Sequence, residues 1–169
     1  MFSGIYNFWN SSASPINLDN NTEVLILVLN TPFTYLQRNY IRETFGQRIK
    51  KSGNLKHTYK LLFLFGLKED YQESFDEIFN ESDKYNDLII PKIEDNYNTV
   101  SLKMLSSFYW ISQINQNSKL KWIIKIDDDV LLNIEKLDTY VNTIIQNELT
   151  DSIYCRVYYG IKPMRQGKW

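Results

Sequence analysis

Short apolar runs alternate with amphipathic segments along most of this chain, and that alternation constrains its fold more than any other feature. The runs are continuous, which is typical of strands buried on both faces of a sheet, and the segments between them carry apolar residues at helical spacing. The expected strands cover residues 24–29, 59–67, 87–90 and 120–126, and the expected helices cover 36–51, 70–82, 98–114 and 134–149. This order predicts right-handed βαβ units, so we expect an α/β fold with a mostly parallel sheet between helices.

Length and composition indicate one ordinary globular domain. The chain has 169 residues, of which 43% are hydrophobic and 23% are charged, enough to form a substantial core. Residues 1–22 are rich in Ser and Asn and are expected to form a loose lead-in, while residues 23–169 form the domain. The net charge of −1 argues against a nucleic-acid-binding protein, which would carry a basic face. No apolar run approaches the ~18 residues needed to cross a bilayer.

The chain holds one cysteine, Cys155, and one histidine, His57. A metal site built from Cys and His is therefore excluded, and so is an internal disulfide. His57 lies in a polar, turn-like stretch, and we expect no catalytic role for it.

Three consecutive aspartates, Asp127, Asp128 and Asp129, directly follow the last expected strand. In open α/β sheets, ligands bind beyond the carboxyl ends of the strands, and three adjacent carboxylates repel one another unless a cation lies among them. If the chain stays extended, Asp127 and Asp129 point to the same side because the side chains of a strand alternate. These two can then share one hard cation, Mn²⁺ or Mg²⁺, with positions left for diphosphate oxygens.

The aspartate cluster has other interpretations. Aspartates after a strand are also typical of a solvated turn and of a helix start. A phosphatase of the haloacid dehalogenase type also begins with Asp-x-Asp after a buried strand and would use Asp127 as its nucleophile, although Val130 and Leu131 replace its usual Gly-Thr. A calcium-binding EF-hand loop is excluded because Leu132 occupies the position that requires Gly. The chain contains neither a Walker loop nor a Gly-x-Gly-x-x-Gly turn.

Six segments, in order along the chain, resemble signatures of the β-1,3-galactosyltransferase and β-1,3-N-acetylglucosaminyltransferase family. They are residues 38–46 (Arg-Asn-Tyr-Ile-Arg-Glu-Thr-Phe-Gly), 63–66 (Phe-Leu-Phe-Gly), 81–89 with Glu81, Tyr85 and Asp87, 95–103 (Asp-Asn-Tyr-Asn-Thr-Val-Ser-Leu-Lys), 125–133 (Lys-Ile-Asp-Asp-Asp-Val-Leu-Leu-Asn) and 155–169, which ends in Lys168-Trp169. Phe45 stands where the family has Trp, and Thr99 stands where it has Asn. Each segment alone is weakly specific, but the ordered set is highly specific.

The resemblance implies a GT-A fold, a Rossmann-like α/β sandwich, here incomplete at its C-terminus. It also implies a metal-dependent, inverting hexosyltransferase. Such an enzyme moves galactose or an N-acetylhexosamine from a UDP-sugar to an acceptor glycan in β-1,3 linkage. The cation, Mn²⁺ or Mg²⁺, would act as a Lewis acid on the diphosphate.

Roles for individual residues follow from the same resemblance. Asp127 and Asp129 are expected to hold the metal. The residues expected to contact the nucleotide-sugar are Arg42, Asp95, Lys103 and Asp128. Arg38 is expected to be structural, and Asn133 is expected to cap the helix that follows it. The aromatic side chains expected in the core are those of Tyr40, Phe45, Tyr97 and Trp110.

The family continues past its Lys-Trp into an acceptor-binding half with an acidic general base, which is expected beyond Trp169. We therefore expect this chain to bind a UDP-sugar and a metal, to show weak or no transfer, and to expose apolar surface between Tyr154 and Trp169. The resemblance further implies a type II membrane protein of the Golgi lumen that glycosylates glycoproteins or glycolipids, with no anchor visible here. The alternative is a catalytically inactive nucleotide-sugar-binding or chaperone-like homologue.

Overall fold

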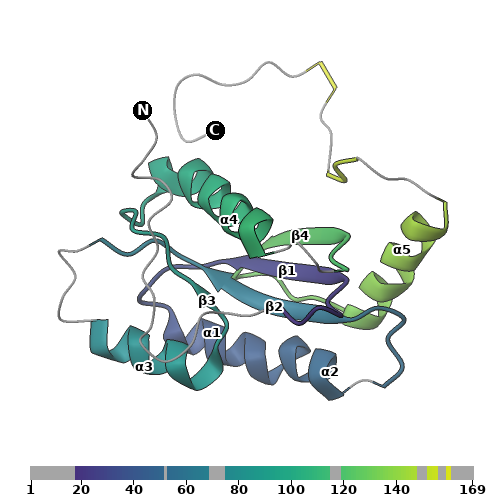
Figure 1. The fold of residues 1–169 in the computed structure, drawn as a ribbon, viewed down its shortest axis with the longest axis horizontal. Helices are drawn as coiled ribbons and strands as arrows, with labels where there is room; N and C mark the ends of the chain where they lie inside the picture. The colour runs from purple at the N-terminus through teal and green to yellow at the C-terminus, as the bar shows by residue number, and fades with distance from the viewer. Residues whose placement is uncertain are drawn as a thin grey trace.

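The structure is a parallel β-sheet between helices, as the alternation predicts. The computed structural model describes residues 18–51, 53–68, 75–114, 119–147, 152–155 and 159–160. Its strands are β1 (Val24–Leu29), β2 (Tyr59–Leu64), β3 (Leu88–Ile89) and β4 (Trp122–Asp127), in the sheet order β3-β2-β1-β4 (Figure 1). Every neighbouring pair is parallel. The predicted α/β, Rossmann-like class is confirmed, and the arrangement is consistent with a GT-A fold.

Strand β1 occupies the interior of the sheet because its apolar run is continuous. Residues 24–28 have no exposed surface, as expected of a parallel strand covered on both faces. It pairs with β2 from Val24 opposite Tyr59 and with β4 from Val24 opposite Trp122. Both pairings run in register to the carboxyl end, where Leu29 lies level with Leu64 and Asp127. The carboxyl ends of the three strands therefore lie at one edge of the sheet.

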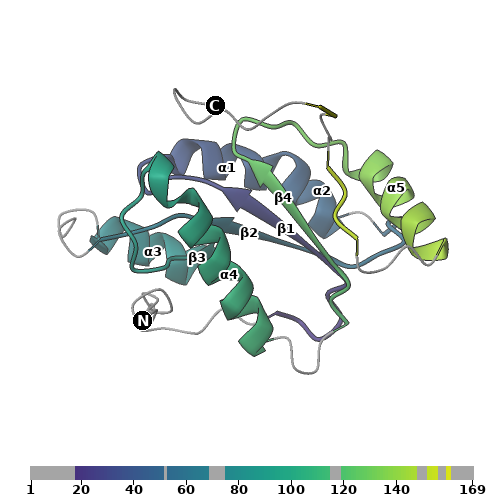
Figure 2. The same ribbon diagram turned by 90° about the horizontal axis from the view of Figure 1, so that it is seen from above.

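Helices cover the two faces unequally (Figures 1 and 2). On one face lie α1 (Tyr35–Glu43), α2 (Phe45–Lys51), α3 (Phe75–Tyr85) and α5 (Ile134–Gln146), whose apolar residues share a core with Val24, Ile26 and Val28. On the other face, α4 (Val100–Ile114) packs through Ile111 on Leu25 and Leu27. The strand period of two separates these two cores.

Several element boundaries differ from the prediction. The helix expected over 36–51 is broken at Thr44 into α1 and α2, and the one expected over 70–82 is seen as α3, with 69–74 outside the described residues. A short 3₁₀ turn, η2 (Tyr97–Thr99), precedes α4. The strand expected over 59–67 ends at Leu64, and after it Gly66 lies so close to the carbonyl oxygen of Ile93 that a Cβ would collide.

Two of the four aromatic residues expected in the core are at the surface. Tyr40 is 58% exposed and Tyr97 is 62% exposed, so the prediction was wrong for both. Both residues lie on the solvent-facing side of their helical turn. Spacing along the sequence shows which residues share a side of a helix, but it does not show which side faces the core. Phe45 is buried, and Trp110 packs partly buried against the α4 core. Of the apolar surface expected between 154 and 169, only Tyr154, Cys155, Tyr159 and Gly160 lie within the described residues, all exposed.

Candidate functional site

The aspartate cluster lies at the carboxyl edge of the sheet, on the outer strand β4. Asp127 is the last residue of that strand, and Asp128 and Asp129 form a turn that is closed by a hydrogen bond from the Val130 amide to the Asp127 carbonyl at 3.3 Å. The backbone therefore does not stay extended through Asp129. The condition under which Asp127 and Asp129 would point the same way by strand alternation is not met, and their shared metal role stays a prediction.

The carboxylates of Asp127 and Asp129 face solvent. The Asp127 side chain is 57% exposed and forms an ion pair with Lys125 Nζ at 2.6 Å. Asp129 is also exposed. Within the described part of the chain, no three His, Cys, Asp or Glu side chains converge as a complete metal cage. An oxygen-only, accessible pair of carboxylates still fits a hard cation that takes few protein ligands and completes its shell with water or phosphate.

Asp128 differs from its neighbours because it is half-buried and held by another strand end. Its Oδ2 accepts a hydrogen bond from Asn30 Nδ2 at 2.6 Å. Burial and the neighbouring charge of Asp129 raise the pKa of Asp128, against the lowering effect of the Asn30 hydrogen bond. The three carboxylates thus repel one another, and a bound cation would relieve that repulsion.

A recess of about 160 Å³ lies beside this turn. One wall is the junction of α1 and α2, and the other is the turn after β4. Its lining residues are Tyr40, Ile41, Thr44, Phe45, Asp128, Asp129, Val130 and Leu131. Two carboxylates beside aromatic and aliphatic side chains make a place for a polar ligand with a flat or apolar face.

Arg42 lies in a buried ion-pair network between α1 and α3. Its Nε and Nη2 donate to the two oxygens of Asp87 at 2.8 Å, Nη2 also donates to Glu81 at 2.7 Å, and Nη1 donates to Asn39 at 3.2 Å. The guanidinium lies 4.9 Å from the ring centre of Phe63 and 3.9 Å from that of Tyr85.

Burial lowers the pKa of Arg42, but Asp87 and Glu81 outweigh burial and raise it overall. Every guanidinium nitrogen already has a partner. The structure therefore places Arg42 in the scaffold, and its expected contact with the nucleotide stays untested.

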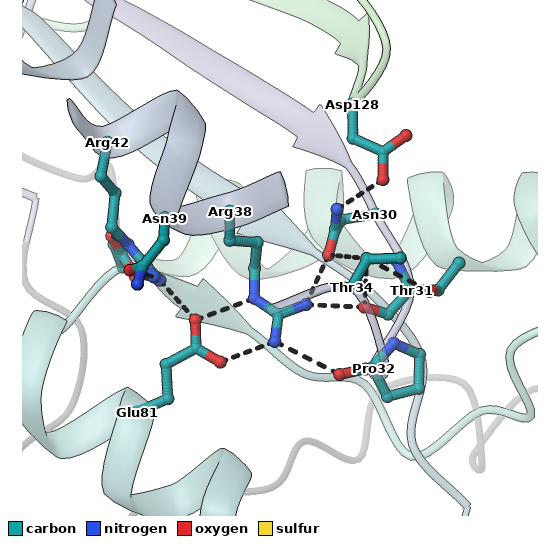
Figure 3. Close-up of polar contacts among 10 residues, drawn as sticks. Asn30, Thr31, Pro32, Thr34, Arg38, Asn39, Arg42, Glu81 and Asp128 are labelled. Atoms are coloured by element: carbon teal, nitrogen blue, oxygen red, sulfur yellow. Dashed lines mark hydrogen bonds and ion pairs between the residues drawn. The ribbon is translucent and has the colours of Figure 1, made fainter. Parts of the chain in front are cut away.

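Arg38 is structural, as predicted. It has no exposed surface, and its guanidinium donates to both oxygens of Glu81, at 2.8 and 2.6 Å. It also donates to Asn30 Oδ1 and to the backbone oxygens of Thr31 and Pro32 (Figure 3). One arginine therefore joins α1, α3 and the loop after β1.

Asp95 and Lys103 pair with each other beyond the end of β2. Lys103 Nζ lies 2.9 Å from both Asp95 oxygens, and the side chains are only 5% and 8% exposed. Asp95 also accepts the Gly66 amide at 2.7 Å. The pair ties the start of α4 to the end of β2, and the expected contacts of both residues with a nucleotide stay predictions.

Asn30 is a site residue that the sequence reasoning missed. It directly follows the strand predicted over residues 24–29, and its side chain holds Asp128. The available indication was its position: a polar residue directly after a buried strand, at the edge where parallel strands place their ligands. Asn133 was assigned correctly, since its side chain caps α5 through the Lys136 amide at 2.9 Å.

The fold and site together define an α/β protein with a Rossmann-like sheet and a carboxylate cluster beyond its strands. The sequence model of the Galactosyltransferase family matches residues 36–169, and the chain therefore belongs to that family. The resemblance found in its motifs is confirmed.

Relatives include a human lactosylceramide 1,3-N-acetyl-β-D-glucosaminyltransferase, 27% identical over 84% of this chain and 38% of the relative. A β-1,3-galactosyltransferase from Caenorhabditis elegans is 29% identical over 84% of this chain and 39% of the relative. A human UDP-GalNAc:β-1,3-N-acetylgalactosaminyltransferase is 30% identical over 76% and 38%. The chain thus spans about two fifths of the length of these relatives.

Across the described residues, every helix is too short or too polar to cross a membrane.

Proposed function

We propose that this chain is the donor-binding part of a metal-dependent β-1,3-hexosyltransferase. The donor would be a UDP-sugar carrying galactose or an N-acetylhexosamine, and the acceptor a glycan on a glycoprotein or glycolipid. The observation that carries the proposal is the cluster of three carboxylates at the carboxyl edge of the sheet, in a chain that the Galactosyltransferase family model matches over residues 36–169. The relatives' names support the linkage and the range of sugars.

The chemistry requires neutralisation of charge on the departing diphosphate. In our proposal, Asp127 and Asp129 hold Mn²⁺ or Mg²⁺, which supplies that neutralisation when bound. Lys125 Nζ lies 2.6 Å from Asp127 Oδ1, so the cation would compete with this exposed ion pair for the carboxylate. The half-buried Asp128 accepts hydrogen bonds from a ribose or donor-sugar hydroxyl through the oxygen that Asn30 does not use.

The remaining donor contacts are proposed at the neighbouring strand ends. Asp95 and Lys103 lie beyond β2, and Arg42 lies on α1, paired with Asp87 and Glu81. Their ion pairs hold them in place, which would reduce the conformational entropy lost on binding. We propose that these three residues give the nucleotide pocket its shape and charge. Among them, Lys103 is the residue that we propose contacts a phosphate group.

We propose that the general base for the acceptor hydroxyl lies outside the residues described here. The activity of the whole protein would then combine this donor site with an acceptor site, in the Golgi lumen and on a membrane anchor, as in type II transferases. The second candidate is an inactive nucleotide-sugar-binding homologue, and it is favoured by the internal pairing of Arg42 with Asp87 and of Lys103 with Asp95. Sugar transfer to an acceptor distinguishes the two.

Calorimetry with UDP tests the donor site directly. We expect binding in Mn²⁺ and at least tenfold weaker binding in EDTA, because the diphosphate charge is then not neutralised. Asp129→Ala should lose most of the gain from Mn²⁺. Asp83→Ala removes an exposed carboxylate on α3 and should bind like the wild type. Equal affinity in Mn²⁺ and EDTA, or in Asp129→Ala and wild type, contradicts the metal role.

A further inference from the structure

Asn30 connects the aspartate cluster to the buried arginines of the scaffold. It follows β1 directly, is 4% exposed, and its backbone amide donates to the Leu64 carbonyl at 2.9 Å. Its side chain reaches the end of the neighbouring strand, where Nδ2 donates to Asp128 Oδ2 at 2.6 Å (Figure 3). The amide therefore bridges two strand ends at the edge where the donor is proposed to bind.

The orientation of this amide is determined by its other partners. Asn30 Oδ1 accepts from Arg38 Nη1 at 2.5 Å and from Thr34 Oγ1 at 2.8 Å. A guanidinium has donors but no acceptor, so the oxygen of the amide must face Arg38. The NH₂ group must then face Asp128. A flipped amide would place NH₂ against the guanidinium and an oxygen against a carboxylate, two unfavourable contacts at once.

Arg38 in turn is fixed from the opposite side. Both of its terminal nitrogens and Nε are engaged, with Glu81 of α3 taking two of the hydrogen bonds. The arginine lies 4.8 Å from the ring centre of Phe65 and has no exposed surface. A continuous chain of hydrogen bonds thus runs from α3 through α1 and the end of β1 to the end of β4 (Figure 3).

We propose that Asn30 is a positioning residue for the donor site: it holds one oxygen of Asp128 and leaves the other directed to the sugar nucleotide. This inference rests on the proposed function, because the donor gives the free oxygen its role. Without Asn30, the half-buried Asp128 would be repelled by Asp129 and would turn away from its position. In a variant that keeps an acceptor for Arg38 and Thr34 at this position, the loss would appear in donor binding more than in stability.

The variant Asn30→Asp tests this role with little change in shape. The new carboxylate can still accept from Arg38 and Thr34, which preserves the scaffold, but it puts an acceptor in place of the donor opposite Asp128. We expect at least a fivefold weaker affinity for UDP-galactose or UDP-N-acetylglucosamine in Mn²⁺ by calorimetry, with a thermal midpoint close to that of the wild type. Asn133→Asp is the matched control: it makes the same change in the same loop as the cluster, and Asp is an equally good N-cap.

A double-mutant cycle decides whether Asn30 acts through Asp128. In an Asp128→Ala background, Asn30→Asp should change donor affinity less than twofold. An equal loss in both backgrounds, an equal loss in Asn133→Asp, or full affinity in Asn30→Asp contradicts the positioning role.

A measurement without ligand separates this inference from the proposed function. The side-chain NH₂ of Asn30 should give well-dispersed, slowly exchanging proton resonances in NMR spectra, and Asp128→Ala should shift them by more than Asp127→Ala does. Absence of that shift contradicts the contact itself. A wild-type chain with the Asn30–Asp128 coupling but no affinity for any UDP-sugar contradicts the proposed function and with it the donor-positioning role.

Discussion

Arg38 and Glu81 show how individual residues hold the carboxyl edge of this sheet together. Both are buried, with side-chain exposures of 1% and 3%, and such charges are tolerated only when they are paired and fully hydrogen-bonded. Arg42 and Asp87 extend the same network. These residues therefore form a network of charged groups near the site that is buried away from solvent.

Replacing Arg38 by Leu should destabilise the chain strongly. Glu81 would keep one arginine but lose two hydrogen bonds, and removing one partner of a buried pair typically costs about 3–5 kcal/mol. Urea unfolding measures the change. Arg48→Ala is the control, because the Arg48–Glu135 pair is exposed by 66% and 52% and should contribute less than about 1 kcal/mol. Similar losses of unfolding free energy in both variants would show that burial does not determine how much the Arg38–Glu81 pair contributes to stability.

Among the elements, the amino ends of three strands are joined by one carboxylate. Glu23, just before β1, accepts the Thr58 amide at 3.3 Å and lies 3.4 Å from His57 Nδ1 and 3.5 Å from Lys121 Nζ. Burial raises the pKa of Glu23, but the Thr58 hydrogen bond and the charges of His57 and Lys121 outweigh burial. The pKa therefore falls below its ordinary value of 4.5.

This lowered pKa predicts a pH dependence of stability. A carboxyl group whose pKa falls on folding stabilises the folded state above its unfolded pKa, and that contribution is lost as the pH drops through the folded pKa. Glu23→Gln should therefore be less stable than the wild type at pH 7, and the difference should shrink below about pH 4. Urea unfolding at both pH values tests this, with the exposed Glu77→Gln on α3 as the control. A difference that grows on acidification would contradict the assigned contacts.

At the scale of the molecule, α4 is apolar on both its inner and outer sides. Leu102, Leu105, Phe108 and Tyr109 are 37–47% exposed, and on the same face of the sheet Ile123 of β4 is 37% exposed. Figure 2 shows α4 lying across this face. Exposed apolar side chains that gather on one face favour association between copies of a chain.

We expect the isolated chain to self-associate through this surface. The double substitution Leu105→Glu and Phe108→Glu should lower the weight-average mass in sedimentation velocity at a given concentration, because it places two charges in the apolar area. Gln113→Glu adds a charge to an exposed polar position on the same helix and should leave the mass unchanged. A monomeric wild type, or an equal effect of Gln113→Glu, would rule out this face as the contact.

Local patterns were sufficient to predict the class of fold, the central strand and the position of the aspartate cluster. Continuous apolar runs, helical spacing and a polar residue at a strand end are properties of neighbours along the chain, so Val24–Leu29 and Asn133 were predicted correctly. The partners of Asp128, Arg42 and Asp95 were not predictable in this way. Asn30, Asp87 and Lys103 lie 98, 45 and 8 positions from Asp128, Arg42 and Asp95 in sequence, and the sheet order brings most of these pairs together.

The break at Thr44, the exposed Tyr40 and the turn at Asp128 were decided by tertiary structure for the same reason. Spacing shows which residues share a side of a helix or strand, but the packing of α1, α2 and β4 determines where each element ends and which side faces the core. The sequence therefore predicted the chemistry of the aspartates. Only the positions of the strand ends and of the buried arginines determine that Asn30 holds Asp128. A hydrogen bond between two strand ends exists only when the sheet has formed.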